Sequence, residues 1–493
     1  MLLGIITSYS LPPYNFFFIN FISFPIFFYF YLGNYRNGKI SSFLIGWFFG
    51  FGYFISNLYW LTNSLTFDQS YKNLIPLAII SIPSFLGLFF GIVTFICYFF
   101  KLEKKFISIL IFSLVFSLIE YLRGFIFGGF PWNLFVYSFS GYKEFLQILS
   151  LFGTHLLNLF VIIIFLIPSI YLLKETINKK HLIIFVTFVL IIINHIFGSY
   201  HINKISFKEY QNISTKIKVI APKIEIERYL YLNDSYQIVE ELVDLSDPNQ
   251  NEKTIFIFPE GTLTGSTLND LSQFKSLINK KFSENHKIIL GINNTEDSDI
   301  FNSLAVLNNK IDVLSIYNKK KLVPFGEFLP FEELISKLGF KKITQGYQSF
   351  SPGKERQVIK LDEIKFLPLI CYEIIYSGEL NEKKEEYDFI LNISEDGWFK
   401  NSIGLNQHFV HSKFRAIEEG KNLIRVANNG TSALINPSGR IIKKIKSTNK
   451  GVFEVNSFVK TDKTIFSMFG NKLYFYFVFF YITLIFFLKF KGR

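Results

Sequence analysis

Long uncharged apolar runs separated by short polar connections dominate the first two hundred residues and return at the end of the chain. A helix that crosses the hydrocarbon core of a bilayer needs roughly 20 mostly apolar residues. The opening run, Met1–Tyr35, contains no Lys, Arg, Asp, Glu or His and is interrupted by Pro12-Pro13, which predicts a short first helix and a second one from about Tyr14 to Leu32. The further runs predict spans over Ile40–Phe67, Asn73–Phe100, Phe106–Leu122, Phe145–Leu173, Leu182–Asn203 and Leu473–Leu488. We therefore expect about eight spans, the short first one included.

A different pattern fills the region from Lys216 to Val455, where short β-branched apolar runs lie between polar stretches of helical periodicity. Helices are predicted over Asn233–Leu245 and Asn406–Gly420. Such a mixture predicts a layered α/β or α+β domain. The predicted strands are Ile217–Ala221, Thr254–Phe258, Ile288–Ile292, Leu304–Leu307, Val313–Tyr317, Phe366–Ile370, Phe389–Ile393, Leu423–Ala427 and Ala433–Asn436, the last two flanking a hairpin with the turn signal Asn436-Pro-Ser-Gly.

Composition agrees with a chain that is part membrane-embedded and part soluble. Half of the 493 residues are apolar and 18% are charged, against about 25% in average soluble proteins. This excludes a disordered chain, a coiled coil and a collagen-like chain. We predict three parts: N-terminal transmembrane helices over 1–204 with about seven spans, a soluble domain over 205–462, and a C-terminal transmembrane helix over 463–493.

The net charge of +12 reflects membrane topology rather than nucleic-acid binding, because much of the basic excess lies between the apolar runs. The basic residues of every second connection are Arg36, Lys39, Lys101, Lys104, Lys105, Lys174, Lys179, Lys180, Lys489, Lys491 and Arg493, whereas the intervening short loops hold Lys72, Arg123 and Lys143. By the positive-inside rule the first set is cytoplasmic. The soluble domain is then expected on the other side, which in a Gram-negative bacterium would be the periplasm, and the C-terminus is expected in the cytoplasm.

Three segments place reactive side chains directly after an apolar strand. Glu260 follows Thr254–Phe258 and Pro259, and a partly buried carboxylate can serve as a base. Cys371 closes the strand before Tyr372 and Glu373, and it is the only cysteine of the soluble part. Taken singly, each has a structural alternative, since Glu260 can cap a helix and Cys371 can be a small buried hydrophobic side chain.

The third segment, Tyr317-Asn-Lys-Lys-Lys-Leu-Val-Pro-Phe-Gly-Glu, follows the strand ending at Tyr317. A lysine run is commonly a solvated face, but this one leads into an apolar stretch that ends in Glu327. An ammonium held near a reacting carbonyl can stabilise a developing oxyanion.

Together these segments resemble the Glu–Lys–Cys triad of the nitrilase, or carbon–nitrogen hydrolase, superfamily. With several membrane spans around it, the chain is similar over essentially its whole length to the apolipoprotein N-acyltransferases. The most specific motifs are Lys-x-x-Leu-Val-Pro-Phe-Gly-Glu (319–327), Ile-Cys-Tyr-Glu (370–373), Arg-Ala-Ile-Glu (415–418) with Arg425 and Asn-Asn-Gly (428–430), Leu-Arg-Gly (122–124) and Gly-Phe-Pro-Trp (129–132).

The resemblance implies a fold and an activity. The fold is a polytopic α-helical membrane domain joined to a four-layer αββα nitrilase-like domain. The activity is ping-pong transfer of a fatty acyl chain from a membrane phospholipid, through a thioester on the cysteine, to the N-terminal amine of the diacylglyceryl-cysteine of apolipoproteins, the last step of bacterial lipoprotein maturation. No cofactor, metal or nucleic acid is implied.

The family roles transfer to matching positions of this sequence. Glu260 resembles the general base, Lys319 the catalytic lysine and Cys371 the nucleophile. The resemblance implies that Glu327 is a second acidic residue supporting the site and that Trp398 is a loop aromatic near the lipid entrance. Two further residues, Tyr372 and Glu373, are implied to line the site.

The first membrane span is truncated relative to the family pattern, and the soluble part departs from that pattern at three places. Phe258 stands where Trp is usual, Ala221-Pro-Lys-Ile where Gln-x-Asn-Ile is common, and Glu395 where Asn is usual. Two alternatives stay open. A membrane-tethered amidase or nitrilase would pass the acyl group to water, although one anchor would then suffice. A transporter or receptor would need ionisable residues along its spans, and their interiors offer few beyond His155 and His195.

Overall fold

The computed structural model of the protein describes residues 1–67, 69–229, 235–263, 265–330 and 349–491. The chain forms two compact units. We call residues 1–204, 402–410 and 464–493 the membrane unit and residues 205–401 and 411–463 the α/β unit. Residues 402–410 lie inside the segment predicted as soluble and group with the membrane unit, so the helix α12 (Ile403–Glu419) is divided between the two units.

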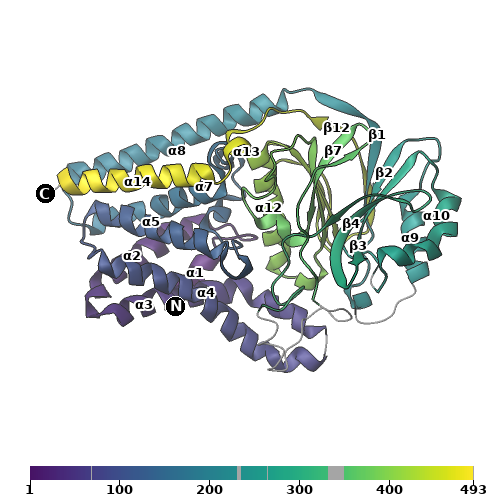
Figure 1. The fold of residues 1–493 in the computed structure, drawn as a ribbon. Coiled ribbons are helices and arrows are strands. Elements are labelled where there is room, and N and C mark those ends of the chain that lie inside the picture. The colour runs from purple at the N-terminus through teal and green to yellow at the C-terminus, as the bar shows by residue number, and fades with distance from the viewer. Residues whose placement is uncertain (68, 230–234, 264, 331–348, 492–493) are drawn as a thin grey trace. The chain divides into compact units, whose positions relative to one another are not determined.

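The membrane unit is built from helices (Figure 1). Among the described residues, seven helical segments are long and apolar enough to cross a membrane. The helix α1 is shorter and accounts for the first of the eight spans expected from the sequence. The helices are α1 (Leu2–Ser8), α2 (Asn20–Asn34), α3 (Lys39–Leu58), α4 (Ile75–Phe99), α5 (Phe106–Arg123), α6 (Lys143–Leu146), α7 (Leu149–Leu166), α8 (Ile177–Ser206, ending two residues into the α/β unit), α13 (Ile465–Phe469) and α14 (Lys472–Lys491).

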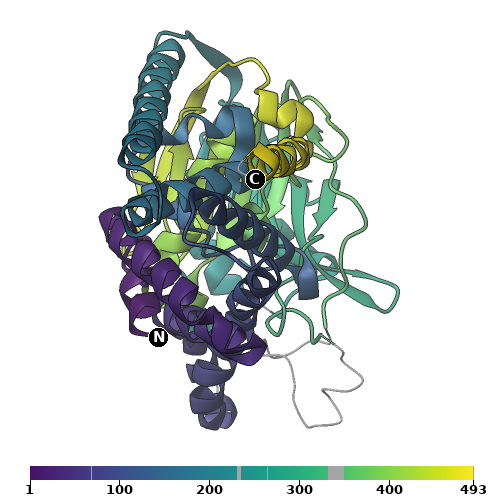
Figure 2. The same cartoon turned by 90° about the vertical axis from the view of Figure 1, so that its left-hand side faces the viewer.

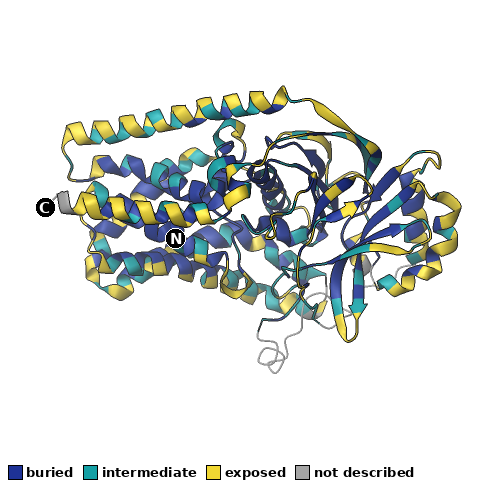
Figure 3. Ribbon diagram, turned by 45° about the horizontal axis from the view of Figure 1, so that its top comes forward, coloured by how far each residue is buried: buried dark blue, intermediate teal, exposed yellow. Residues whose placement is uncertain are grey.

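Small residues let the helices of this unit approach closely, as is usual where lipid removes the hydrophobic drive between helices. A Cβ atom on Gly46 of α3 would lie 2.2 Å from the carbonyl oxygen of Phe90 of α4. Aromatic rings fill the space that remains, with Phe24, Phe90 and Phe116 all buried. By contrast, α8 lies at the edge of the unit and is exposed along most of its length (Figures 2 and 3).

The α/β unit contains two six-stranded sheets, in the orders β12-β1-β2-β3-β4-β5 and β11-β10-β9-β8-β7-β6. In each sheet three neighbouring strands are parallel, β1, β2 and β3 in the first and β7, β8 and β9 in the second. The strands are β1 (Tyr210–Ala221), β2 (Thr254–Ile257), β3 (His286–Glu296), β4 (Asp299–Asn308), β5 (Val313–Asn318), β6 (Ile359–Leu361), β7 (Ile364–Ile370), β8 (Phe389–Glu395), β9 (Asn422–Asn428), β10 (Ser432–Ile435), β11 (Ile441–Ile445) and β12 (Gly451–Val459).

The two sheets share one apolar core. Ile255 and Leu304 of the first sheet pack in the same buried cluster as Leu391 and Val426 of the second. A second cluster joins the other face of the first sheet to the helices α9 (Ser235–Ser246) and α10 (Lys275–Lys281). The later part of α12 flanks the second sheet (Figure 1), where its Ile417 lies against Gly439. The order helix, sheet, sheet, helix is the predicted four-layer fold.

Each of the nine predicted strands is present, but β6, β11 and β12 were not predicted. β6 has only three residues, too few for its alternation to stand out, and β11 reads Ile-Ile-Lys-Lys-Ile with an exposed middle, so it lacks the expected alternation. The turn predicted at Asn436–Gly439 is present, but the hairpin assigned to it was wrong: β9 and β10 do pair antiparallel, whereas this turn joins β10 to β11. The error arose because the edge strand after the turn is too polar to recognise.

Candidate active site

Glu260 leaves the carboxyl end of β2 in a turn packed tightly against β3. A Cβ atom on Gly291 of β3 would lie 2.4 Å from Cα of Glu260, so only glycine fits there. The carboxylate of Glu260 is buried, and its Oε2 accepts the backbone N–H of Glu395 at 2.8 Å. Its Oε1 accepts from the Lys319 ammonium at 3.1 Å. The base candidate is therefore held on both oxygens.

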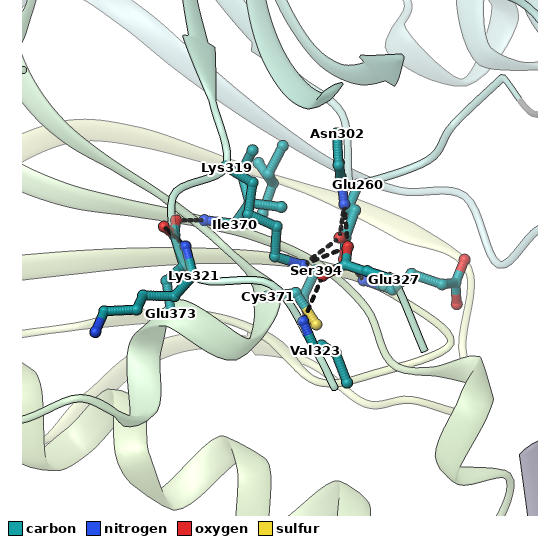
Figure 4. A network of polar contacts seen from close by, with 12 residues as sticks. Glu260, Asn302, Lys319, Lys321, Val323, Glu327, Ile370, Cys371, Glu373 and Ser394 are labelled. Carbon is teal, nitrogen blue, oxygen red and sulfur yellow. Dashed lines mark hydrogen bonds and ion pairs between the residues drawn. The ribbon is translucent and has the colours of Figure 1, made fainter. Parts of the chain in front are cut away.

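Lys319 lies between two carboxylates at the end of β5. Its Nζ is 3.1 Å from Oε1 of Glu260 and 2.9 Å from Oε1 of Glu327, and its side chain is 1% exposed. Asn302 of β4 donates to the same two oxygens at 2.7 Å each, which closes a ring of four side chains (Figure 4). Burial alone would lower the pKa of Lys319, but the charges of Glu260, Glu327 and Cys371 raise it well above its ordinary value. Lys319 is thus a fixed cation at neutral pH.

Cys371 follows the last residue of β7 with φ of +49°, in the left-handed region that a non-glycine residue adopts at a cost of about 1–3 kcal/mol. It is half-buried, whereas Glu260, Lys319 and Glu327 are buried. The pKa of the thiol is raised well above its ordinary value, chiefly by burial and then by the charge of Glu260, while Lys319 and a hydrogen bond with Ser394 oppose the rise. The resting sulfur is therefore a protonated thiol beside a base (Figure 4).

Glu373 is fully buried and receives five hydrogen bonds on its two oxygens. Oε2 accepts from the backbone N–H of Ile370 at 2.8 Å. Oε1 accepts from the backbone N–H groups of Lys320 and Lys321, the Tyr317 hydroxyl and the Arg356 guanidinium, at 3.0, 3.2, 2.6 and 2.6 Å. Rather than facing an open pocket, this carboxylate joins the segment after Lys319 to the strand end before Cys371.

The Arg-Ala-Ile-Glu motif on α12 supports the turn that follows Cys371 from the other side. Arg415 donates to the backbone carbonyl of Ile375 at 3.2 Å, and Glu418 accepts from the Ser377 hydroxyl at 2.7 Å. Arg415 and Glu418 also form a fully buried ion pair of 2.8 Å. This motif therefore holds the backbone that carries the nucleophile.

A second motif, Arg425 with Asn428–Gly430, lies at the ends of β8 and β9. Arg425 binds both carboxylate oxygens of Asp396 at 2.9 Å and also contacts Asn392, whose amide donates to the carbonyl of Cys371 at 3.5 Å. A Cβ atom on Gly430 would lie 2.1 Å from Oδ2 of Asp396, which explains the glycine.

Two of the three departures from the family pattern meet at one place in the structure. The amide of Asn428 donates both to the Glu395 carboxylate at 2.7 Å and to the carbonyl of Ile224 at 2.9 Å. Asn429 likewise reaches Ile224 at 2.7 Å and Glu395 at 3.3 Å. The unusual Glu395 and the unusual segment 221–224 therefore share their partners.

Two predicted site residues remain, Tyr372 directly after Cys371 and Trp398 three residues after Glu395. Tyr372 is buried and packs edge-on against Tyr376 with ring centroids 5.5 Å apart. Trp398 is half-buried in the short 3-10 turn after β8. Sequence reasoning missed Asn302 and Arg356. The chain offers no local signal for Asn302, which lies inside a strand, or for Arg356, which lies in a polar connection.

Comparison with known proteins gives consistent results over most of the chain. A family model described as the apolipoprotein N-acyltransferase N-terminal domain matches residues 3–167, and one described as carbon-nitrogen hydrolase matches residues 237–456. The apolipoprotein N-acyltransferase of Rickettsia prowazekii (strain Madrid E) is 31% identical over 446 residues, which cover 88% of this chain and 87% of that relative.

The apolipoprotein N-acyltransferase of Rhizobium rhizogenes (strain K84) is 30% identical over 474 residues, covering 92% of this chain and 88% of the relative. Among solved structures, a mutant of the Nesterenkonia AN1 amidase from the nitrilase superfamily matches 51% of this chain and 92% of that chain. It does so at 13% identity and a TM-score of 0.37.

Proposed function

The chain belongs to the apolipoprotein N-acyltransferase family, and on that premise we propose that Cys371, Glu260 and Lys319 carry the acyl transfer. The enzyme is a multi-pass membrane acyltransferase with a carbon–nitrogen hydrolase domain. The observation that carries the assignment is the buried ring of Glu260, Lys319, Glu327 and Asn302 beside a half-buried thiol.

In the first half-reaction, Glu260 takes the proton from Sγ of Cys371 and the thiolate attacks an ester carbonyl of a membrane phospholipid. The oxyanion that forms needs donors already in place. An ammonium has three donors. Among the described residues, two carboxylates accept from Lys319, which leaves a donor for the oxyanion. The ester bond then breaks, the lysophospholipid leaves with the proton from Glu260, and a thioester remains on Cys371.

In the second half-reaction, the N-terminal amine of a diacylglyceryl-cysteine attacks the thioester. Glu260 accepts a proton from the amine, and the proton returns to the departing thiolate, so the enzyme is regenerated and the amide product leaves. One covalent intermediate shared by two substrates predicts ping-pong kinetics. The burial of Glu260 and Lys319 limits water at the reacting centre, which favours aminolysis over hydrolysis.

The charge pattern of the connections supports an orientation. Basic residues gather in every second connection, so by the positive-inside rule the α/β unit faces the periplasm and the C-terminus the cytoplasm of an inner membrane. Donor and acceptor then reach the thiol from the outer leaflet, where both are lipid-anchored. Trp398, half-buried beside the Glu395 segment, is the proposed contact for entering lipid.

Intact-mass analysis after incubation with a labelled phospholipid tests the proposal. The purified enzyme should gain one acyl chain on Cys371 and lose it when a diacylglyceryl peptide is added. Cys371→Ser should fold and insert but gain no chain. Full acylation of that variant would remove the nucleophile assignment, and release of free fatty acid without any requirement for an amine would favour the amidase alternative.

A further inference from the structure

Arg356 lies in the polar connection before β6, yet its side chain is buried and donates four hydrogen bonds. Its NH2 donates to Oε1 of Glu373 at 2.6 Å and its Nε to the hydroxyl of Tyr317 at 3.1 Å. Its NH1 donates to the carbonyl oxygens of Glu379 and Leu380 at 3.0 and 3.1 Å. The guanidinium is therefore fixed by backbone on one side and by a carboxylate on the other.

The carboxylate that Arg356 binds holds the backbone next to two reactive side chains. Glu373 accepts the N–H of Lys320, the residue after Lys319, and the N–H of Ile370, the residue before Cys371. Lys320 and Ile370 are fifty residues apart in the sequence, and both donate to the one carboxylate of Glu373. The relative position of ammonium and sulfur depends on it.

A buried carboxylate keeps such a role only while it stays ionised. Burial alone would raise the pKa of Glu373, but Arg356 and the Tyr317 hydroxyl, with a smaller effect of Lys319, bring this pKa below its ordinary value. Among the described residues, Tyr376 is a further titratable group that interacts with Glu373. Without the guanidinium, desolvation would favour the protonated acid, which accepts fewer hydrogen bonds.

We propose that Arg356 is a positioning residue of the acyl-transfer site and acts through Glu373 on the segments that carry Lys319 and Cys371. The inference rests on the proposed function, because it concerns the rate at which the Cys371 thioester forms. A displacement of about 1 Å at a reacting group can cost about 100-fold in rate. We expect a loss of that size in thioester formation when Arg356 is replaced by an uncharged side chain.

The test compares Arg356→Met, Arg356→Lys, Glu373→Gln and the double variant Arg356→Met/Glu373→Gln. The readout is the single-turnover rate of acyl adduct formation with labelled phospholipid, per folded molecule, as a function of pH. Lys354→Met is the matched control, because this exposed cation lies two residues away on the same segment and should react at the wild-type rate.

Arg356→Met should form the adduct about 100-fold more slowly. Because the pKa of Glu373 rises without the guanidinium, the rate of this variant should also begin to fall at a higher pH than that of the wild type when the solution is acidified. Arg356→Lys should be less impaired than Arg356→Met, because lysine keeps the positive charge but lacks the planar set of guanidinium donors. The double variant should be no slower than the slower single variant, since both changes break one link.

A wild-type rate in Arg356→Met, or losses that multiply in the double variant, would overturn the inference. If Arg356→Met does not fold, Tyr317→Phe removes only a hydroxyl that both Arg356 and Glu373 contact. It should be several-fold slower, with the same upward shift of the acid limb, and an unchanged rate and pH profile would count against the inference. A wild-type enzyme that forms no adduct would instead overturn the proposed function.

Discussion

One buried ionic cluster of the α/β unit and one of the membrane unit contain similar residues but differ in their balance of charge. In the α/β unit the Lys319 ammonium lies between Glu260 and Glu327, so the cluster holds one more carboxylate than ammonium. In the membrane unit Glu120 and Arg123 form a pair of equal and opposite charges at 3.6 Å, both 1% exposed. The first cluster lies within electrostatic reach of the half-buried thiol of Cys371.

The second cluster stabilises irregular backbone inside the membrane unit. Arg123 donates to the carbonyl of Phe130, and Asn158 donates to Glu120 at 2.6 Å while accepting from the N–H of Val136 at 3.0 Å. Unpaired backbone groups are costly at membrane depth. Burial of charge by itself is therefore no sign of catalysis. The proposed assignment rests on an unbalanced cluster beside a half-buried nucleophile.

The largest effect is expected for Lys319→Met. It removes the proposed oxyanion donor and leaves two buried carboxylates facing each other, so the rate of acyl adduct formation should fall at least about 1000-fold. Because Lys319 opposes the rise in the pKa of Cys371, alkylation of that thiol should also need a higher pH in the variant. Both are measured by mass analysis of the Cys371 peptide.

Lys320→Met and Lys321→Met are the controls for this result. Their side chains pair with Glu382 and Glu379 at 2.7 and 2.9 Å and are about a quarter to a third exposed. Each should change the rate by less than about threefold, since partly exposed ion pairs contribute little. If Lys320 proved indispensable and Lys319 did not, the register of the catalytic lysine would be wrong.

Glu120→Gln should act on stability and not on chemistry. Removing one partner of a buried ion pair costs about 3–5 kcal/mol, so the unfolding midpoint in detergent should drop clearly. The rate of adduct formation per folded molecule should stay near that of the wild type. Glu103→Gln, in an exposed pair with Lys105, should leave both unchanged. A specific loss of catalytic rate in folded Glu120→Gln would remove the distinction between the clusters.

The sequence was sufficient for the features that leave a local signal. Uncharged runs of about 20 residues predicted the long membrane helices, and apolar runs ending in a reactive side chain located Glu260 and Cys371. The meeting of Glu260 with Lys319 could be expected only by resemblance, because fifty-nine residues separate them along the chain.

Other contacts have no counterpart in local sequence. Asn302 bridges two carboxylates only because β4 pairs with both β3 and β5. Arg356 stands in a charged connection that reads as solvated, and its burial depends on the carbonyl groups of a distant turn. Such residues are selected by tertiary packing, which neither periodicity nor motif spacing encodes.

The smallest effect on the rate of adduct formation among the site variants is expected at Glu395. This residue lies between the Glu260–Lys319–Glu327 cluster and the unusual segment 221–224. The backbone of Glu395 holds Glu260, while its carboxylate accepts from Asn428, Asn429 and the N–H of Gly397, the last at 2.8 Å. Glu395→Gln keeps the shape but replaces one acceptor oxygen by a donor, so about one hydrogen bond, roughly 1 kcal/mol, is lost.

The rate of adduct formation should therefore fall about fivefold, through a small shift of the Glu260 carboxylate against its Glu395 N–H partner. Glu386→Gln, which changes an exposed partner of Lys463, should leave the rate unaltered. Single-turnover measurements on both variants decide the question. A loss as large as that of Lys319→Met would mean that the Glu395 carboxylate belongs to the reacting cluster itself. Glu395 would then count, with Glu260 and Glu327, among the carboxylates of that unbalanced cluster.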